Sequence, residues 1–78
     1  MDGMSELSTA PMHRLLKKAG AERVSEEAAE ELRRVLEEVG MMISSEAIRR
    51  ALSAGRKTVR REDVRSAALE LIPGIKLD

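Results

Sequence analysis

The densest cluster of positive charge in this sequence lies in its second half. Four cationic side chains fall within a run of six residues: Arg56, Lys57, Arg60 and Arg61. Guanidinium and ammonium groups are the side chains that proteins use to bind phosphate oxygens. The run is therefore either a phosphate-binding surface or an ordinary solvated one, and its residues alone leave both interpretations open.

Acidic residues gather in a different, earlier segment. The sequence has 14 Lys and Arg residues against 14 Asp and Glu residues, so its formal net charge is zero. This balance argues against a simple polycation, and any binding to nucleic acid would depend on where the charges lie. The acids are concentrated at Glu26, Glu27, Glu30, Glu31, Glu37 and Glu38.

Arrangements of residues that would support catalysis or cofactor binding are missing. There is no cysteine, and His13 is the single histidine, so the sequence offers neither a disulfide nor a zinc site. It also lacks a nucleophile–base pair, a phosphate-binding loop and a metal-binding cluster. We therefore predict a protein without enzymatic activity, cofactor, metal or small-molecule substrate, in which His13 is solvated.

Membrane insertion and single-strand recognition are also disfavoured. No apolar run approaches the roughly 20 residues of a membrane span, and residues 1–4 lack the features of a signal peptide. Phe, Tyr and Trp are absent, whereas proteins that bind single strands or RNA loops use aromatic side chains as stacking platforms. These features predict a soluble, cytoplasmic protein without a membrane partner.

Three helices are expected to position the charged residues. Pro11 marks the start of the first helix at about residue 9, and Gly20 ends it. Ser25 is a good N-cap for a second helix that continues to residue 54 and stops before Gly55. The third helix runs from about residue 60 to residue 72 and ends before Pro73. The sequence therefore predicts an all-α protein with a short, a long and a short helix.

This organisation implies one domain over residues 9–72, between a flexible arm (residues 1–8) and a tail (residues 73–78). The central helix would be roughly 43 Å long at 1.5 Å per residue, and each flanking helix only ~15–20 Å. Short helices folded back onto the long one leave apolar side chains in its middle exposed to water. A chain this small also needs a staple or a partner. We therefore predict a dimer whose core contains Leu32, Val35, Leu36, Val39 and Ile43.

Several segments resemble the archaeal histones, in the expected order and at the expected spacing. These segments are Ala10-Pro11…Arg14, Ala19-Gly20-Ala21-Glu22-Arg23-Val24-Ser25, Leu36-Glu37-Glu38, Ser45-Glu46-Ala47, and Ala54-Gly55-Arg56-Lys57-Thr58-Val59 followed by Glu62-Asp63-Val64. The second and the last are highly specific, and the resemblance covers about residues 7–71. It implies the histone fold, with two copies paired head to tail in a handshake homodimer.

The resemblance further implies wrapping of double-stranded DNA without base-specific contacts. In the handshake, the first loop of one protomer lies beside the second loop of the other, and the first helices add a third basic site. By the same resemblance, Asp63 forms a structural salt bridge with Arg56, although a simple role in the first turn of its helix is an alternative. The implied DNA-binding residues are Arg14, Lys17, Lys18, Arg23, Ser25, Arg56, Lys57, Thr58, Arg60 and Arg61.

The sequence departs from the family pattern at the contact between dimers. The family typically has a leucine and a histidine near the end of the long helix, where this chain has Arg50 and Ser53, and Ser66 replaces a position that is often apolar. Asp63 could neutralise Arg50 across such a contact, but its expected partner Arg56 competes for it, and the patch is poorly self-complementary. We therefore expect the free protein to stop at the dimer.

Two functions are compatible with these features. The first is a sequence-tolerant chromatin protein of the nucleoid that compacts DNA, as a homodimer or as a heterodimer with a paralogue. The second is a histone-fold interaction module of a transcription or chromosome-associated complex with weak DNA binding, which the zero net charge and the Arg50 and Ser53 replacements favour. Met41 and Met42 are interpreted first as additional core residues and second as a soft protein-binding patch.

Overall fold

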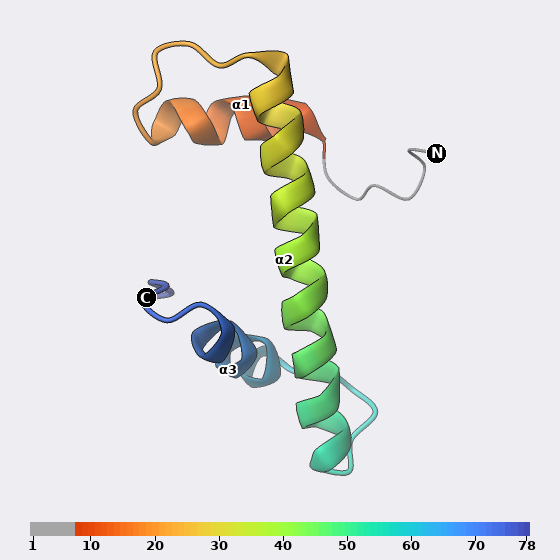
Figure 1. The fold of residues 1–78 in the computed structure, drawn as a ribbon. Coiled ribbons are helices and arrows are strands. Elements are labelled where there is room, and N and C mark those ends of the chain that lie inside the picture. Colours follow the sequence, from red (N-terminus) through yellow and green to blue (C-terminus); the bar gives the residue numbers. More distant parts are fainter. Residues whose placement is uncertain (1–7) are drawn as a thin grey trace, which may run out of the picture. The chain divides into compact units, whose positions relative to one another are not determined.

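The computed structural model describes residues 8–78, and this range forms three α-helices and no strand (Figure 1). The helices are α1 (Thr9–Lys18), α2 (Glu26–Ser53) and α3 (Arg61–Leu71). The predicted all-α class and the order of short, long and short helix are confirmed. The predicted flexible arm, residues 1–8, lies outside the described residues apart from Ser8.

The chain divides into two compact units, and α2 contributes to both. The N-terminal unit comprises residues 1–39 and the C-terminal unit residues 40–78. In Figure 1, α2 is drawn as one continuous helix, which includes Gly40. A Cβ added at Gly40 would meet nothing within 4 Å. No close approach within this chain therefore requires a glycine there.

Both loops begin with a glycine at positive φ, as the sequence predicts. Gly20 follows α1 with φ +124°, and Gly55 follows α2 with φ +76°. The amide after each glycine donates to a carbonyl five residues earlier, over 3.1 Å to Leu16 and 2.9 Å to Ala51. Such bonds satisfy carbonyls that the helix end leaves free, and glycine adopts this backbone conformation at the lowest cost.

The N-terminal unit has a small core at α1 and the start of α2. Among the described residues of this unit, Met12 and Ala29 are the buried apolar ones, with 7% and 0% of their surface exposed. Ser25 caps α2 as predicted, because its Oγ accepts a hydrogen bond of 3.0 Å from the Ala28 N–H. The unit therefore combines one adaptable side chain, a methionine, with one alanine.

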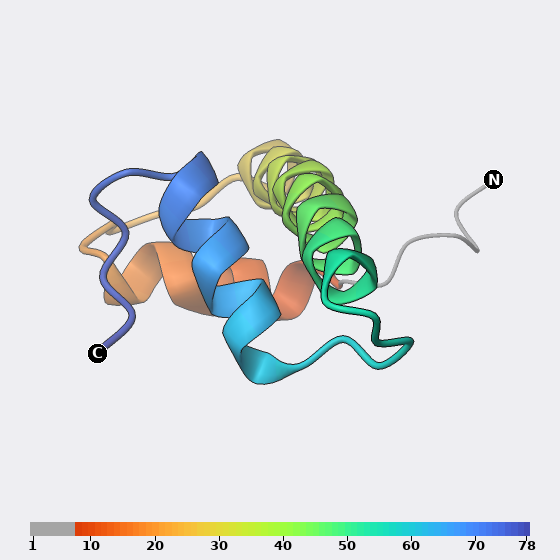
Figure 2. The ribbon, with the colours of Figure 1, turned by 90° about the horizontal axis from the view of Figure 1, so that it is seen from below.

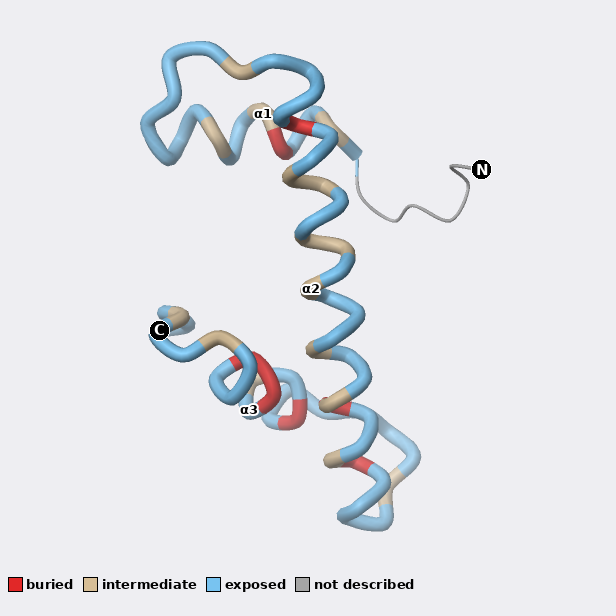
Figure 3. The backbone as a smooth tube through the Cα atoms, viewed as in Figure 1, coloured by how far each residue is buried: buried red, intermediate tan, exposed pale blue. Residues whose placement is uncertain are grey.

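The C-terminal unit has a core of alanines. Figures 1 and 2 show α3 beside the C-terminal half of α2, to which the second loop connects it. The buried residues of these two segments, drawn red in Figure 3, include Ala47, Ala51, Ala67 and Ala68. Each alanine buries little apolar surface, so this core is small.

Large apolar side chains remain uncovered throughout residues 8–78. None of them is fully buried in this range, and Val35 of the predicted dimer core is 47% exposed. The other predicted core residues, Leu32, Leu36, Val39 and Ile43, are partly exposed. A single chain of this size leaves too much apolar surface in water to be stable alone.

Met41 and Met42 are both exposed. The first interpretation of these two residues, as additional core residues, is therefore wrong for the single chain. Over the described residues, no helix combines the length and the apolar character needed to cross a lipid bilayer.

Candidate nucleic-acid interface

Basic residues of the described chain fall into two groups, according to whether they form ion pairs. The paired residues are Arg33, Arg34, Arg49, Arg50, Arg56, Arg60 and Arg65. Within residues 8–78, the cations without an ion pair are all exposed, and they are Arg14, Lys17, Lys18, Arg23, Lys57, Arg61 and Lys76. All of them except Lys76 belong to the predicted DNA-binding set. The ion pairs within the chain therefore neutralise mainly cations that lie outside the predicted DNA-binding set.

Arg56 braces the loop between α2 and α3. Its guanidinium donates two hydrogen bonds to the Asp63 carboxylate, Nη1 to Oδ2 over 2.8 Å and Nη2 to Oδ1 over 2.9 Å. Nη1 also donates to the Thr58 carbonyl over 2.9 Å, and Asp63 Oδ2 accepts the Arg60 N–H over 2.8 Å. The structure thus joins the two residues of the predicted salt bridge, and Asp63 also lies in the first turn of α3. Lys57, between these anchors, stays exposed.

The electrostatics of Asp63 explain why this brace is strong. Only 5% of its side chain is exposed, and burial on its own raises the pKa of a carboxyl group. The hydrogen bonds from the Arg56 guanidinium and the Arg60 N–H outweigh burial and hold the pKa of Asp63 well below its usual value. The same pairing raises the pKa of Arg56. Both groups therefore stay charged in the folded protein.

In the N-terminal unit the predicted phosphate contacts are exposed on α1 and on the loop that follows it. Arg14, Lys17 and Lys18 belong to α1, and Arg23 belongs to the loop. The spacing of the three α1 cations places them on one side of the helix. Ser25 is also exposed, although its Oγ already accepts a backbone N–H at the start of α2.

His13 is partly solvated, with 31% of its side chain exposed, and it takes part in a contact that the sequence does not predict. It is half-buried, and its Nε2 lies 3.0 Å from Glu26 Oε1, which links α1 to the first turn of α2. This hydrogen bond lowers the pKa of Glu26. Because a loop separates His13 from Glu26, no local sequence pattern predicts this pair. Across the described residues, no group of three or more His, Cys, Asp or Glu side chains could hold a metal ion.

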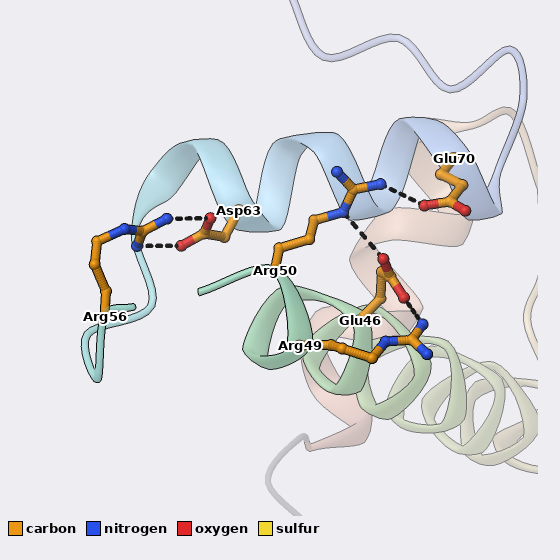
Figure 4. A network of polar contacts seen from close by, with 6 residues as sticks. All are labelled: Glu46, Arg49, Arg50, Arg56, Asp63 and Glu70. Carbon is orange, nitrogen blue, oxygen red and sulfur yellow. Dashed lines mark hydrogen bonds and ion pairs between the residues drawn. The ribbon is translucent and has the colours of Figure 1, made fainter. Parts of the chain in front are cut away.

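Arg50 lies between two carboxylates of its own chain, as Figure 4 shows. Its Nη2 donates to Glu70 Oε1 over 2.5 Å, and its Nε is 3.1 Å from Glu46 Oε2, while Arg49 pairs with the other oxygen of Glu46. Within its own chain Asp63 is engaged by Arg56, so Arg56 competes for the carboxylate that was expected to neutralise Arg50 across a dimer–dimer contact. Glu46 could have been predicted from the sequence as a partner of Arg50, because the two residues have i,i+4 spacing on one helix. Glu70, on another helix, could not.

The remaining residues of the predicted dimer–dimer contact are polar and exposed. Ser53 ends α2 and Ser66 lies in α3, and both are open to solvent. With Arg50 neutralised inside the chain, this region presents two serines and internally paired charges. It offers little apolar surface to a second dimer.

Comparison with known proteins gives matches over most of the chain. Residues 5–68 match the model of a family described as histone-like transcription factor (CBF/NF-Y) and archaeal histone. The chain is 55% identical, over 64 residues, to one of the subunits of the archaeal histone HAN1 from Thermococcus zilligii. It is 48% identical, over 64 residues, to the probable archaeal histone 3 of Methanocaldococcus jannaschii. Each alignment covers 82% of this chain and 96% of the relative.

Proposed function

Because the chain belongs to the family of histone-like transcription factors (CBF/NF-Y) and archaeal histones, we propose that it binds and compacts double-stranded DNA as a chromosome-associated histone. Its contacts go to the phosphate backbone, and they tolerate any base sequence. The role is structural and does not involve catalysis. The histone fold of the family agrees with the three helices and their order.

The observation that carries this proposal is the distribution of unpaired cations. An arginine paired with a carboxylate projects little net field, whereas an unpaired cation on the surface attracts phosphate at a distance of about a Debye length, ~8 Å at physiological salt. In a chain of zero net charge, the exposed cations of α1 and of both loops therefore dominate the attraction. Lys57 is presented on a loop that Arg56 and Asp63 brace.

The DNA-binding unit is a homodimer in the handshake arrangement. The support for a partner is the apolar surface left open on α2, where Val35 is almost half exposed and Leu32, Leu36, Val39 and Ile43 are partly exposed. Burying such side chains contributes several kcal/mol, at ~25 cal/mol per Å² of apolar surface. In the handshake, Arg23 of one protomer lies near the basic loop of its partner, so each end of the dimer gains one phosphate-binding site. The proposed partner is a second identical chain.

A gel-shift titration on two unrelated duplexes, at several salt concentrations, tests the proposed surface. Arg14→Ala, Arg23→Ala and Lys57→Ala should each reduce the slope of log K against log salt by about one, equally on both duplexes. Arg34→Ala and Arg49→Ala are matched controls. They remove the same charge from exposed residues whose ion pairs already neutralise it, so their slopes should stay at the parental value. Equal losses in all five variants would show that the surface is wrong.

The exposure of Met41 and Met42 favours a second function, a protein-interaction module with weak DNA binding. The family itself includes transcription factors. The same titration separates the two functions. A dimer that binds neither duplex above low salt would favour the interaction module.

A further inference from the structure

An apolar stripe runs along the C-terminal half of α2 and is not covered by its own chain. Met41 is 65% exposed, Ile48 48% and Leu52 62%, and the small residue Ser45, also exposed, completes the row. The spacing of four, three and four residues brings these side chains to one side of the helix, as in a coiled-coil seam. We call this row (Met41, Ser45, Ile48 and Leu52) the outer stripe.

The outer stripe is distinct from the surfaces assigned above. At about 100° per residue, the centre of the stripe is rotated by about 170° from Ile43, which belongs to the proposed dimer core. It is rotated by about 110° from Ala47 and Ala51, which are buried in the C-terminal unit. Neither α3 nor a handshake partner packed on the Ile43 side therefore covers the stripe.

DNA is not a suitable occupant of this surface. The stripe contains no charged residue, and Arg49 beside it is paired with Glu46. Phosphates need unpaired cations, whereas an exposed row of large apolar side chains is stabilised by another apolar surface. The stripe therefore fits a helix of matching shape.

We propose that the outer stripe pairs, in antiparallel fashion, with the outer stripe of a second copy that belongs to another dimer. A twofold axis between Ser45 and Ile48 sets Met41 against the partner's Leu52, and the small Ser45 against the partner's Ile48. Large side chains then meet either a small one or one of similar size, as close packing requires. A parallel pairing would set serine against serine and leave a void.

The surface on one side of the outer stripe is slightly hollowed beside Ser45. A shallow depression lies there, and Ser45 is one of the residues that line it. The other lining residues are Met42, Glu46, Arg49 and Leu71.

The size of the stripe determines how strongly it pairs. Stable interfaces bury about 1,200–2,000 Å² in total, and three large side chains on each copy provide much less. The pairing is therefore weak in dilute solution, and it becomes populated where dimers lie close together, because a shared DNA raises their effective concentration. Each dimer carries two stripes, so twofold pairing at both extends into a chain of dimers. This array rests on the proposed dimer, whereas the pairing itself needs no DNA and does not use Arg50.

Sedimentation equilibrium of the free full-length protein, from micromolar concentration to about 1 mM, tests the proposal. The parent should show mass above the dimer at the concentrated end, whereas the sequence predicts a free protein that stops at the dimer. Met41→Glu and Leu52→Arg should each abolish this excess, because each buries an unpaired charge. The double variant Met41→Glu/Leu52→Arg should restore at least half of it, since antiparallel pairing sets the new acid against the new base. Leu69→Glu, which places a charge at an exposed leucine of α3, is the control and should associate like the parent.

Several results would overturn the proposal. These are a parent that stays dimeric at about 1 mM, single variants that associate as it does, a double variant without recovery, or a control that also loses the excess mass. Helical circular dichroism of every variant verifies that the fold is intact. A monomeric mass at the dilute end would instead count against the proposed dimer. The dilute samples therefore test the proposed dimer, and the concentrated samples test the pairing of the outer stripes.

Discussion

The N-terminal and C-terminal units start their loops alike but use their basic residues differently. In the N-terminal unit, the cations of α1 and its loop have no ion pair among the described residues. In the C-terminal unit, Arg50, Arg56 and Arg65 form ion pairs that connect separate segments. The cations of α1 and its loop are thus available to a ligand, as are Lys57, Arg61 and Lys76 of the C-terminal unit, whereas Arg50, Arg56 and Arg65 hold that unit together. A count of charges, which is zero for the whole chain, does not reveal this division of labour.

The two cores should also differ in how well they tolerate added side-chain volume. Met12 and Ala29 form the buried apolar part of the N-terminal unit, whereas alanines alone form that of the C-terminal unit. A methionine has three rotatable bonds and can move aside, but an alanine has no side-chain freedom to give. The C-terminal unit should therefore respond more sharply to added volume.

Overpacking each unit tests this difference and should give the largest effect. Ala47→Leu and Ala29→Leu add the same volume at positions that are 0% exposed. Overpacking costs typically 1–3 kcal/mol, and we expect about 3 kcal/mol for Ala47→Leu and about 1 kcal/mol for Ala29→Leu. Urea denaturation at one fixed protein concentration measures both. Equal losses, or a larger loss for Ala29→Leu, would contradict the proposed contrast between the cores.

Acid titration compares the ion pairs of the two units. The pKa of Asp63 in the folded protein is far below the unfolded value of about 3.9. Its contribution to stability is therefore fully present above that value and is lost as the pH falls below it. The melting temperature of Asp63→Asn should lie below that of the parent at pH 6, and the gap should close as the pH falls below about 4.

Glu26→Gln provides the matching measurement in the N-terminal unit. The pKa of Glu26 is also lowered, by its hydrogen bond with His13, so the effect has the same sign. Glu26 is exposed, unlike Asp63, so its contribution should be smaller. A gap for Glu26→Gln as wide as that for Asp63→Asn would indicate that the brace of the second loop is no stronger than the link of α1 to α2.

The smallest expected effect is at Gly40, where the two units divide. This glycine is exposed in mid-helix, and an added Cβ meets nothing within 4 Å. Gly40→Ala should therefore raise the free energy of unfolding by about 0.8–1 kcal/mol. Ser44→Ala, also at an exposed position of α2, controls for helix propensity alone. Destabilisation by Gly40→Ala but not by Ser44→Ala would mean that the partner's backbone in the dimer touches Gly40.

Local signals determined the ends of the helices. Gly20 and Gly55 occupy positions where the backbone takes a positive φ, and the Ser25 hydroxyl accepts a backbone N–H at the start of α2. Each of these features depends on residues within one helical turn, so the amino-acid types alone are informative. The need for a partner also followed from the sequence, because it requires only the lengths of the helices and the positions of apolar residues.

Tertiary structure alone decided how the charges are paired and which apolar residues stay exposed. Glu70 engages Arg50 from 20 residues away, and Glu26 engages His13 across a loop. The sequence assigned Arg50 to a different contact, and it placed Met41 in the core, although the side chain is 65% exposed. The physical reason is the same in each case. Helix periodicity and capping depend on neighbours in the chain, whereas an ion pair or the burial of a side chain depends on which segments the fold brings within a few ångströms.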